Sequence, residues 1–120
     1  MLQALVVDDD EYIRLLFDDI LKTAGFETVM AGTASAAIAK LGDFTPAIAF
    51  IDYNMPGATG IEVIQFIRRT PRLSSVKVVV VTANSQAENA VETLGIDLFL
   101  EKPVSAHDVI QFARRLTATS

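Results

Sequence analysis

The chain has no cysteine and no tryptophan, and it has few basic residues. The lack of cysteine excludes disulfide bonds, thiolate metal sites and a thiol nucleophile, and it fits the cytoplasmic location that we expect. Lys and Arg number 10 against 15 Asp and Glu, which gives a net charge of -5. An acidic chain lacks the positive surface that attracts phosphate backbones or anionic lipids, so we expect no direct nucleic-acid binding and no membrane association.

Long hydrophobic runs are also missing. The longest apolar stretches, AIAFI and VVVV, have the length of a strand and cannot span a bilayer. The first residues, MLQALVV, carry no positive charge and lead directly into DDDE, which is not a signal-peptide pattern. With 120 residues, 51% of them hydrophobic, we expect one compact domain over residues 1–120.

Five short apolar runs alternate with stretches of helical periodicity. The runs have strand length and cover residues 4–7, 27–31, 47–51, 76–81 and 98–100. Apolar residues at helical spacing occupy 13–24, 34–41, 61–67, 87–94 and 110–116. Strands without polar alternation are buried on both faces, so the pattern predicts a doubly wound α/β fold with a five-stranded parallel sheet between two layers of helices.

Capping patterns precede three of the expected helices. The pairs are Thr59 with Glu62, Ser85 with Glu88, and Ser105 with Asp108. Arginines near helix ends and His107, in the first turn of the last helix, are expected to be solvated. We therefore predict no nucleic-acid patch and no catalytic role for His107.

Polar residues gather where the predicted strands end. They are Asp8, Asp9 and Asp10 after the first strand, Asp52 and Asn54 after the third, Thr82 and Ala83 after the fourth, and Lys102 and Pro103 after the fifth. Ligands of open parallel sheets bind beyond the carboxyl ends of the strands, so these residues should meet at one edge. Helix capping explains an Asp or a Thr after one strand, but it explains the whole set poorly.

Bringing Asp8, Asp9 and Asp52 together requires a cation. Two like charges about 4 Å apart repel by roughly 4 kcal/mol at an effective dielectric constant near 20. The ligands on offer are carboxylates and a backbone carbonyl after Asp52, and such oxygen ligands suit Mg²⁺, with Mn²⁺ as a substitute. We therefore predict a magnesium site.

A carboxylate can also act as a nucleophile, and Asp52 is our candidate. It would accept a phosphoryl group, a reaction that needs a metal and cationic help for the charged oxygens. The Lys102 ammonium, the Thr82 hydroxyl and the Ala83 backbone N–H could hold the three phosphoryl oxygens.

Four segments, LVVDDDEY, FIDYNMPGATG, VVVVTAN and LFLEKPV, resemble the motifs of the receiver domains of two-component response regulators, such as the chemotaxis regulators. The resemblance covers essentially the whole chain. It implies a flavodoxin-like sheet with strand order 2-1-3-4-5 and five helices. It also implies phosphorelay signalling, in which Asp52 takes a phosphoryl group from the phosphohistidine of a sensor histidine kinase or phosphotransfer protein. Such a domain catalyses only its own phosphorylation and dephosphorylation.

The resemblance assigns roles residue by residue. It implies Asp52 as phosphoacceptor, Asp9 as direct Mg²⁺ ligand and Asp8 as a partner through water. The Asn54 backbone carbonyl would be the third protein ligand, and Lys102 would contact the phosphoryl group and bridge to the acidic pocket.

A conformational switch is implied as well. The Thr82 hydroxyl would turn toward the phosphoryl group and Phe99 would move inward, although Phe99 is also plausible as plain core. The partner-binding face would be formed by the fourth helix, the fifth strand and the fifth helix, and a homodimer on phosphorylation is left open. Asn54 and Asn84 hold positions that tune dephosphorylation in relatives, and the bond before Pro103 is expected to be cis.

The turn PGATG departs from many relatives at Ala58 and Thr59, whereas Gly60 matches.

Two other functions stay open. Asp8-x-Asp10 is similar to haloacid-dehalogenase-like phosphatases, in which Asp8 would be the nucleophile, but Tyr12 stands where that family has Thr or Val. The other is a receiver-like module that binds partners without phosphorylation, although every residue whose loss marks such modules is present. A flavin-binding function is a poorer alternative, because no phosphate loop follows the first strand.

Overall fold

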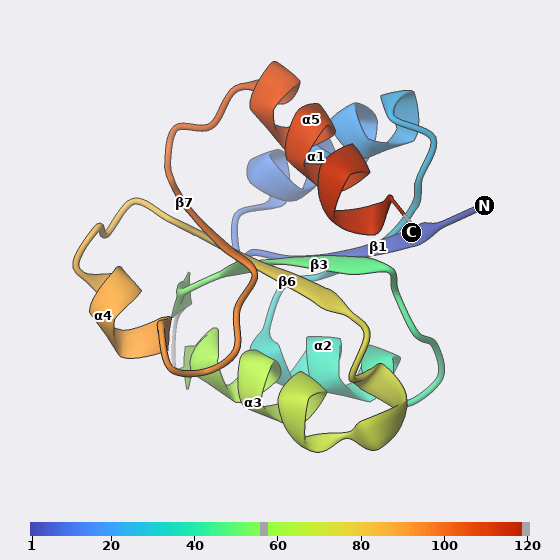
Figure 1. Cartoon of the computed structure of the whole chain (residues 1–120). Helices are drawn as coiled ribbons and strands as arrows, with labels where there is room; N and C mark the ends of the chain where they lie inside the picture. The colour runs from blue at the N-terminus through green and yellow to red at the C-terminus, as the bar shows by residue number, and fades with distance from the viewer. Residues whose placement is uncertain (56–57, 119–120) are drawn as a thin grey trace.

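Five parallel strands form one sheet at the centre of the computed structural model, which describes residues 1–55 and 58–118 (Figure 1). The strands are β1 (Gln3–Val7), β2 (Glu27–Ala31), β3 (Ile48–Asp52), β6 (Lys77–Thr82) and β7 (Leu98–Glu101). They lie in the order β2-β1-β3-β6-β7, and all neighbouring pairs are parallel. Counted along the chain this is the order 2-1-3-4-5, so the predicted doubly wound fold is confirmed.

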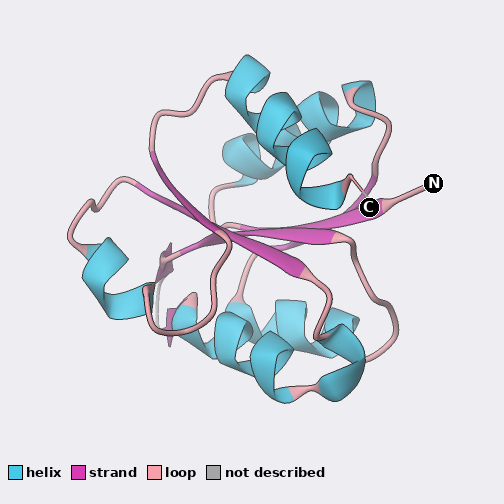
Figure 2. Ribbon diagram, in the orientation of Figure 1, coloured by secondary structure: helices cyan, strands magenta, loops and turns pink. Residues whose placement is uncertain are grey.

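Helices cover both faces of the sheet (Figures 1 and 2). On one face lie α1 (Glu11–Thr23) and α5 (Ala106–Thr117). On the other lie α2 (Ala34–Leu41) and α3 (Ile61–Arg69), followed by the 3₁₀ turn η1 (Pro71–Leu73). The short α4 (Ala87–Val91) connects β6 to β7 and packs its Val91 into the same core as α2 and α3.

Each face of the sheet carries its own hydrophobic core, because successive side chains of a strand point to opposite faces. Leu5, Ile51 and Val80 pack toward α2 and α3. Val6, Phe50 and Val81 pack toward α1 and α5, where the rings of Phe17 and Phe50 lie 5.5 Å apart. The sheet is therefore buried on both sides, which explains the unbroken apolar runs of the sequence.

The helix starts agree only partly with the capping patterns. Ser105 caps α5 as predicted, because its Oγ accepts a hydrogen bond from the Asp108 N–H at 3.0 Å. The predicted cap at Ser85 is wrong, because α4 begins after Gln86 and has no side-chain cap. The N-cap residue of α3 is Gly60, and the side chain of Thr59, on which the other predicted cap depends, lies outside the part of the chain that the structure describes. The backbone carbonyl of Ser85, rather than its hydroxyl, accepts the Glu88 N–H.

Two further differences concern the chain after β3 and after β6. A small antiparallel hairpin of β4 (Asn54–Met55) and β5 (Ala58–Thr59) was not predicted. The helix predicted over 87–94 ends at Val91, and turns lead from there to Gly95, whose φ of 82° suits glycine. Within the described residues, no helix is both long and apolar enough to cross a membrane.

Candidate functional site

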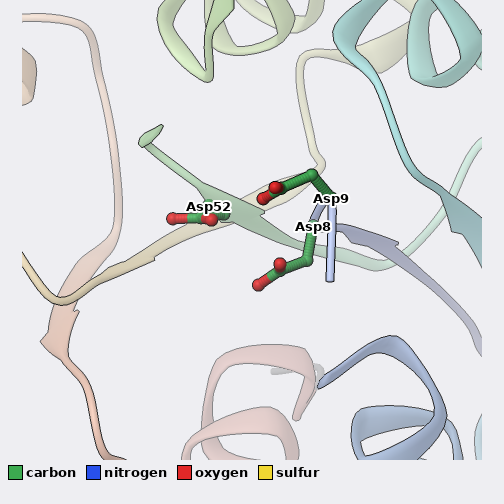
Figure 3. Close-up of side chains that lie close together, drawn as sticks. All are labelled: Asp8, Asp9 and Asp52. Carbon is green, nitrogen blue, oxygen red and sulfur yellow. The ribbon is translucent and has the colours of Figure 1, made fainter. Parts of the chain in front are cut away.

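Asp8, Asp9 and Asp52 meet at the carboxyl edge of the sheet, where β1 and β3 end (Figure 3). One carboxylate oxygen of each lies within 4.8 Å of the others. Asp8 is 4% exposed and Asp52 6%, whereas Asp9 is open to solvent. The structure thus brings together the three acids that the sequence predicts to share a cation.

Asp8 is held by hydrogen bonds to all four of its polar atoms. Its N–H donates to the Ala31 carbonyl at 3.1 Å, and its carbonyl accepts from Arg14 Nη1 at 2.7 Å. Its Oδ1 accepts from the Asp10 N–H at 2.9 Å, and its Oδ2 accepts from Lys102 Nζ at 2.8 Å. The orientation of Asp8 is therefore set by the protein itself.

Lys102 follows β7 and reaches across the sheet edge to the acids. Its backbone N–H donates to the Thr82 carbonyl at 2.8 Å, and its Nζ lies 3.6 Å from Asp52 Oδ2. Burial alone lowers the pKa of Lys102, but the hydrogen bond to Asp8 and the charges of Asp52 and Asp8 outweigh it and raise that pKa. The side chain remains an ammonium. The Lys102–Pro103 bond is cis, as the resemblance implies.

The negative charge of Asp52 is only partly compensated by the groups around it. Burial raises its pKa to about 6; the Lys102 charge and the hydrogen bond from the Asn54 N–H oppose this shift, while the charges of Asp8 and Asp9 add to it. One ammonium faces three carboxylates, so the pocket is left negatively charged. Carboxylate oxygens around a surplus of negative charge fit a hard divalent cation.

Thr82, at the end of β6, is fully buried beside the acids. Its hydroxyl accepts hydrogen bonds from the Asn84 N–H at 3.2 Å and from Asn54 Nδ2 at 3.4 Å. Asn84 in turn accepts the Gln86 N–H at 3.0 Å. Both asparagines thus lie at the edge of the pocket, and Asn54 directly contacts the predicted switch residue.

Phe99 lies in β7 opposite Val80 of β6. It is half-buried and packs against the core of the α2 and α3 side, whereas its neighbours Leu98 and Leu100 pack on the other face. Ala83 is exposed next to Thr82. Both residues are therefore in places that suit the roles predicted for them, and those roles stay predictions.

Gly60 lies very close to the backbone of Asp52, which gives a physical reason for its match to the family motif. A β-carbon here would lie 2.5 Å from the Asp52 carbonyl oxygen and 2.8 Å from Ile51 Cγ2. The Gly60 N–H donates to the Tyr53 carbonyl at 2.8 Å. Glycine is thus needed at Gly60 because the start of α3 lies directly against the backbone of Asp52.

The sequence analysis missed Arg14 and misjudged Arg68. Arg14 lies four residues after the helix cap Asp10, and a basic residue one turn into a helix that follows an acidic loop is the signal that could have found it. Arg68 is not simply solvated: it donates to the Gly95 and Val76 carbonyls and pairs with Asp97 at 3.1 Å. His107, as expected, is exposed in the first turn of α5.

The family model of the response regulator receiver domain matches residues 4–114, and the chain belongs to this family. Among curated proteins it is similar to PhoB of Escherichia coli (strain K12), a phosphate regulon transcriptional regulatory protein, with 31% identity over 108 residues. The match covers 88% of this chain and 47% of PhoB, so the chain spans about half the length of that relative.

Solved structures agree with this assignment. The response regulator TrrA of Thermotoga maritima, in complex with Mg²⁺-BeF, has a TM-score of 0.86 at 27% identity, over 97% of this chain and 99% of TrrA. A CheY-like receiver domain protein of Methanospirillum hungatei JF-1 has a TM-score of 0.88, also at 27% identity, over 98% of this chain and 94% of that one.

The chain is therefore a receiver domain of two-component signalling, with the acidic pocket that is typical of a metal-binding phosphoacceptor site. Its family is one of signalling domains rather than of enzymes in the usual sense. Membership in this family removes the basis for a haloacid-dehalogenase-like phosphatase with Asp8 as its nucleophile.

Proposed function

We propose that Asp52 accepts a phosphoryl group from the phosphohistidine of a sensor histidine kinase or phosphotransfer protein, with Mg²⁺ as the cofactor. The observation that carries this proposal is the gathering of three carboxylates within 4.8 Å, with the Lys102 ammonium against both buried ones. A buried carboxylate with a raised pKa beside a cation is a combination expected at a reactive site.

The hydrogen bonds of Asp8 support different roles for the three acids in metal binding. Because both Asp8 oxygens accept hydrogen bonds from the protein, Asp9 and Asp52 are better placed to touch the ion directly, and Asp8 would act through water. The Asn54 carbonyl would complete the protein ligands. Bound Mg²⁺, or Mn²⁺ in its place, would neutralise part of the charge on the phosphoryl oxygens.

In the transfer step an oxygen of the Asp52 carboxylate attacks phosphorus. The P–O bond to Asp52 forms as the P–N bond breaks, and the bonding electron pair stays on the imidazole nitrogen of the donor. Asp52 is largely ionised at neutral pH, since its pKa is about 6. The Lys102 ammonium, the Thr82 hydroxyl and the Ala83 N–H would hold the transferred oxygens. Water later hydrolyses the acyl phosphate, and Asn54 and Asn84 at the pocket edge would set the rate.

The output would be a change on one face of the domain. New acceptor oxygens beside Thr82 would draw its hydroxyl away from Asn54 and Asn84, and Phe99 would move inward. We propose that α4, β7 and α5 then bind a downstream protein or a second copy of the chain. Because the match covers less than half of PhoB, the output of the whole protein is part of this proposal. A cytoplasmic location and the lack of nucleic-acid and membrane contacts stay predictions of the sequence.

The test is intact-protein mass spectrometry after incubation with acetyl phosphate or phosphoramidate and Mg²⁺. We expect one phosphoryl adduct on the wild type, none on Asp52→Asn, and none on the wild type with EDTA. An adduct that survives Asp52→Asn but is lost in Asp8→Asn would reverse the assignment. If no adduct forms under any condition, the proposed phosphoryl transfer is contradicted, and the alternative of a partner-binding module that acts without phosphorylation is favoured.

A further inference from the structure

Arg14 lies in the first half of α1 and reaches back to the acidic loop. Its half-buried side chain donates from Nη1 to the Asp8 carbonyl at 2.7 Å. We propose that Arg14 is a positioning residue of the metal site, which holds the loop of Asp8 and Asp9 in the conformation that binds a divalent cation. The inference rests on the proposed function, since it concerns the same site.

The atom that Arg14 contacts explains why this bond matters for Asp9. The Asp8 carbonyl belongs to the rigid peptide plane that also contains the Asp9 N–H. A hydrogen bond to that carbonyl therefore fixes the plane from which the Asp9 side chain departs. Of the other bonds of Asp8, the one from the Asp10 N–H to Oδ1 closes a turn around this plane, but none is made to the carbonyl of the plane itself. The direction of Asp9, which is exposed to solvent, therefore depends in part on Arg14.

The guanidinium also lies close to a second loop. A β-carbon on Gly32, between β2 and α2, would lie 3.0 Å from Arg14 Nη1. The absence of a side chain at Gly32 leaves the space that the guanidinium fills. Arg14 therefore lies between the loop after β1 and the loop after β2, and a methyl group at Gly32 would crowd Nη1, the atom that donates to the Asp8 carbonyl.

Two roles of Arg14 make opposite predictions about metal binding. A cation near an acidic pocket repels a second cation, so if Arg14 acted mainly as a counter-ion, its removal would tighten Mg²⁺ binding. If Arg14 positions the loop, its removal weakens binding. Loss of a residue that orients a metal ligand commonly costs about 10- to 100-fold in metal affinity.

The experiment measures Mg²⁺ affinity by isothermal titration calorimetry on the full chain. We expect Arg14→Met, which keeps the length and removes the donor, to bind Mg²⁺ about 10-fold or more weakly. Arg14→Lys should recover part of this loss, because it can donate one hydrogen bond. Gly32→Ala, which leaves Arg14 in the sequence, should weaken binding in the same direction. Lys22→Met is the matched control, since Lys22 is an exposed cation of the same helix that pairs with Asp18.

A second readout separates positioning from general stability. The amide hydrogen of Asp9 should exchange faster in Arg14→Met without metal, while amides in the middle of β3 keep their protection. Mg²⁺ binding by Arg14→Met that equals or exceeds that of the wild type overturns the inference. If Arg14→Met does not fold, Gly32→Ala and Arg14→Lys carry the test, and unchanged affinity in both overturns it.

The result is independent of phosphoryl transfer. A wild type that binds Mg²⁺ and loses affinity in Arg14→Met, yet forms no adduct on Asp52, supports the inference and contradicts the proposed function. A wild type that forms the adduct, with an Arg14→Met variant of unchanged Mg²⁺ affinity, does the reverse. A wild type that binds no Mg²⁺ overturns both.

Discussion

Lys102 Nζ lies 2.8 Å from Asp8 Oδ2 and 3.6 Å from Asp52 Oδ2, so one ammonium is shared by two buried carboxylates that belong to different strands. The three residues come from the ends of β1, β3 and β7. The pair with Asp8 is the closer one and carries a hydrogen bond, whereas the contact with Asp52 is longer. Lys102 is therefore bound firmly to Asp8 and more loosely to Asp52.

Replacing Lys102 with Met should destabilise the metal-free domain. Breaking a buried ion pair by removing one partner typically costs about 3 to 5 kcal/mol, and the half-buried Lys102 suggests a value at or below the low end. Urea denaturation with EDTA measures this loss, and Mg²⁺ should restore part of it by compensating the same charges. Lys22→Met, which removes an exposed cation, should change the free energy of unfolding little. Equal stability of Lys102→Met and the wild type would contradict the ion-pair argument.

The stability of the metal-free domain should fall as the pH rises from about 4 to 6. The pKa of Asp52 is about 6 in the folded state against 3.8 for an ordinary Asp, so the folded state binds more protons in this interval. The contribution is favourable below pH 3.8 and is lost as the pH rises through about 6. Asp52→Asn should remove this pH dependence.

The same argument predicts that Asp52→Asn stabilises the domain at pH 7 in EDTA by roughly 1 to 3 kcal/mol, after allowance for solvent screening. Saturating Mg²⁺ should reverse the order, because a ligand stabilises the folded state that binds it, and the wild type binds more tightly. Denaturation curves at pH 5 and pH 7, with and without Mg²⁺, make the comparison. A variant that is less stable than the wild type in EDTA at pH 7 would refute the raised pKa.

Gly60→Ala should disturb the segment around Asp52 without replacing an acidic residue. The new methyl group would lie 2.5 Å from the Asp52 carbonyl, so the backbone must shift, at a cost of about 1 to 3 kcal/mol. We expect a lower melting temperature and slower adduct formation on Asp52. Gly42→Ala is the control, because Gly42 has a helical φ of -65° at the end of α2 and a β-carbon there would lie 3.2 Å from the Ala39 carbonyl oxygen, a much milder contact. Normal phosphorylation of Gly60→Ala would show that the loop adapts.

Thr82→Ala should separate phosphorylation from its structural effect. The variant keeps the acids and Lys102, so Asp52 should still take a phosphoryl group, although more slowly. The hydroxyl that would follow the phosphoryl group is gone, and the backbone of β7 around Phe99 should then keep its resting hydrogen exchange. Hydrogen exchange of phosphorylated wild type and variant tests this, and equal changes in both would exclude Thr82 as the link.

The sequence predicted the parts of this structure that depend on periodicity and strand ends. Val6 and Ile51 belong to runs that are apolar on both faces, and only a covered parallel sheet satisfies such runs. Because parallel strands all end at one edge, Asp8 and Asp52 had to meet once the sheet was assigned. The fold and the acidic cluster therefore followed from local patterns.

The features that were missed depend on which segments approach each other in space. Gly60 is needed because of the Asp52 carbonyl, and Arg14 has its role because of the Asp8 carbonyl. Neither of these two contacts produces a periodic pattern in the sequence. The cap predicted at Ser85 was wrong for a related reason. The pattern of Ser followed three residues later by Glu also occurs in a turn that is closed by backbone hydrogen bonds alone.

The engagement of every polar atom of Asp8 has a consequence for how such a domain can diverge. The partners of Asp8 come from the end of β2, from the turn before α1, from α1 itself and from the turn after β7, so each of these segments helps to set the geometry of the pocket. If the proposed function holds, substitutions in these neighbouring segments would change the ion affinity and the lifetime of the phosphoryl group while the acids themselves stay unchanged.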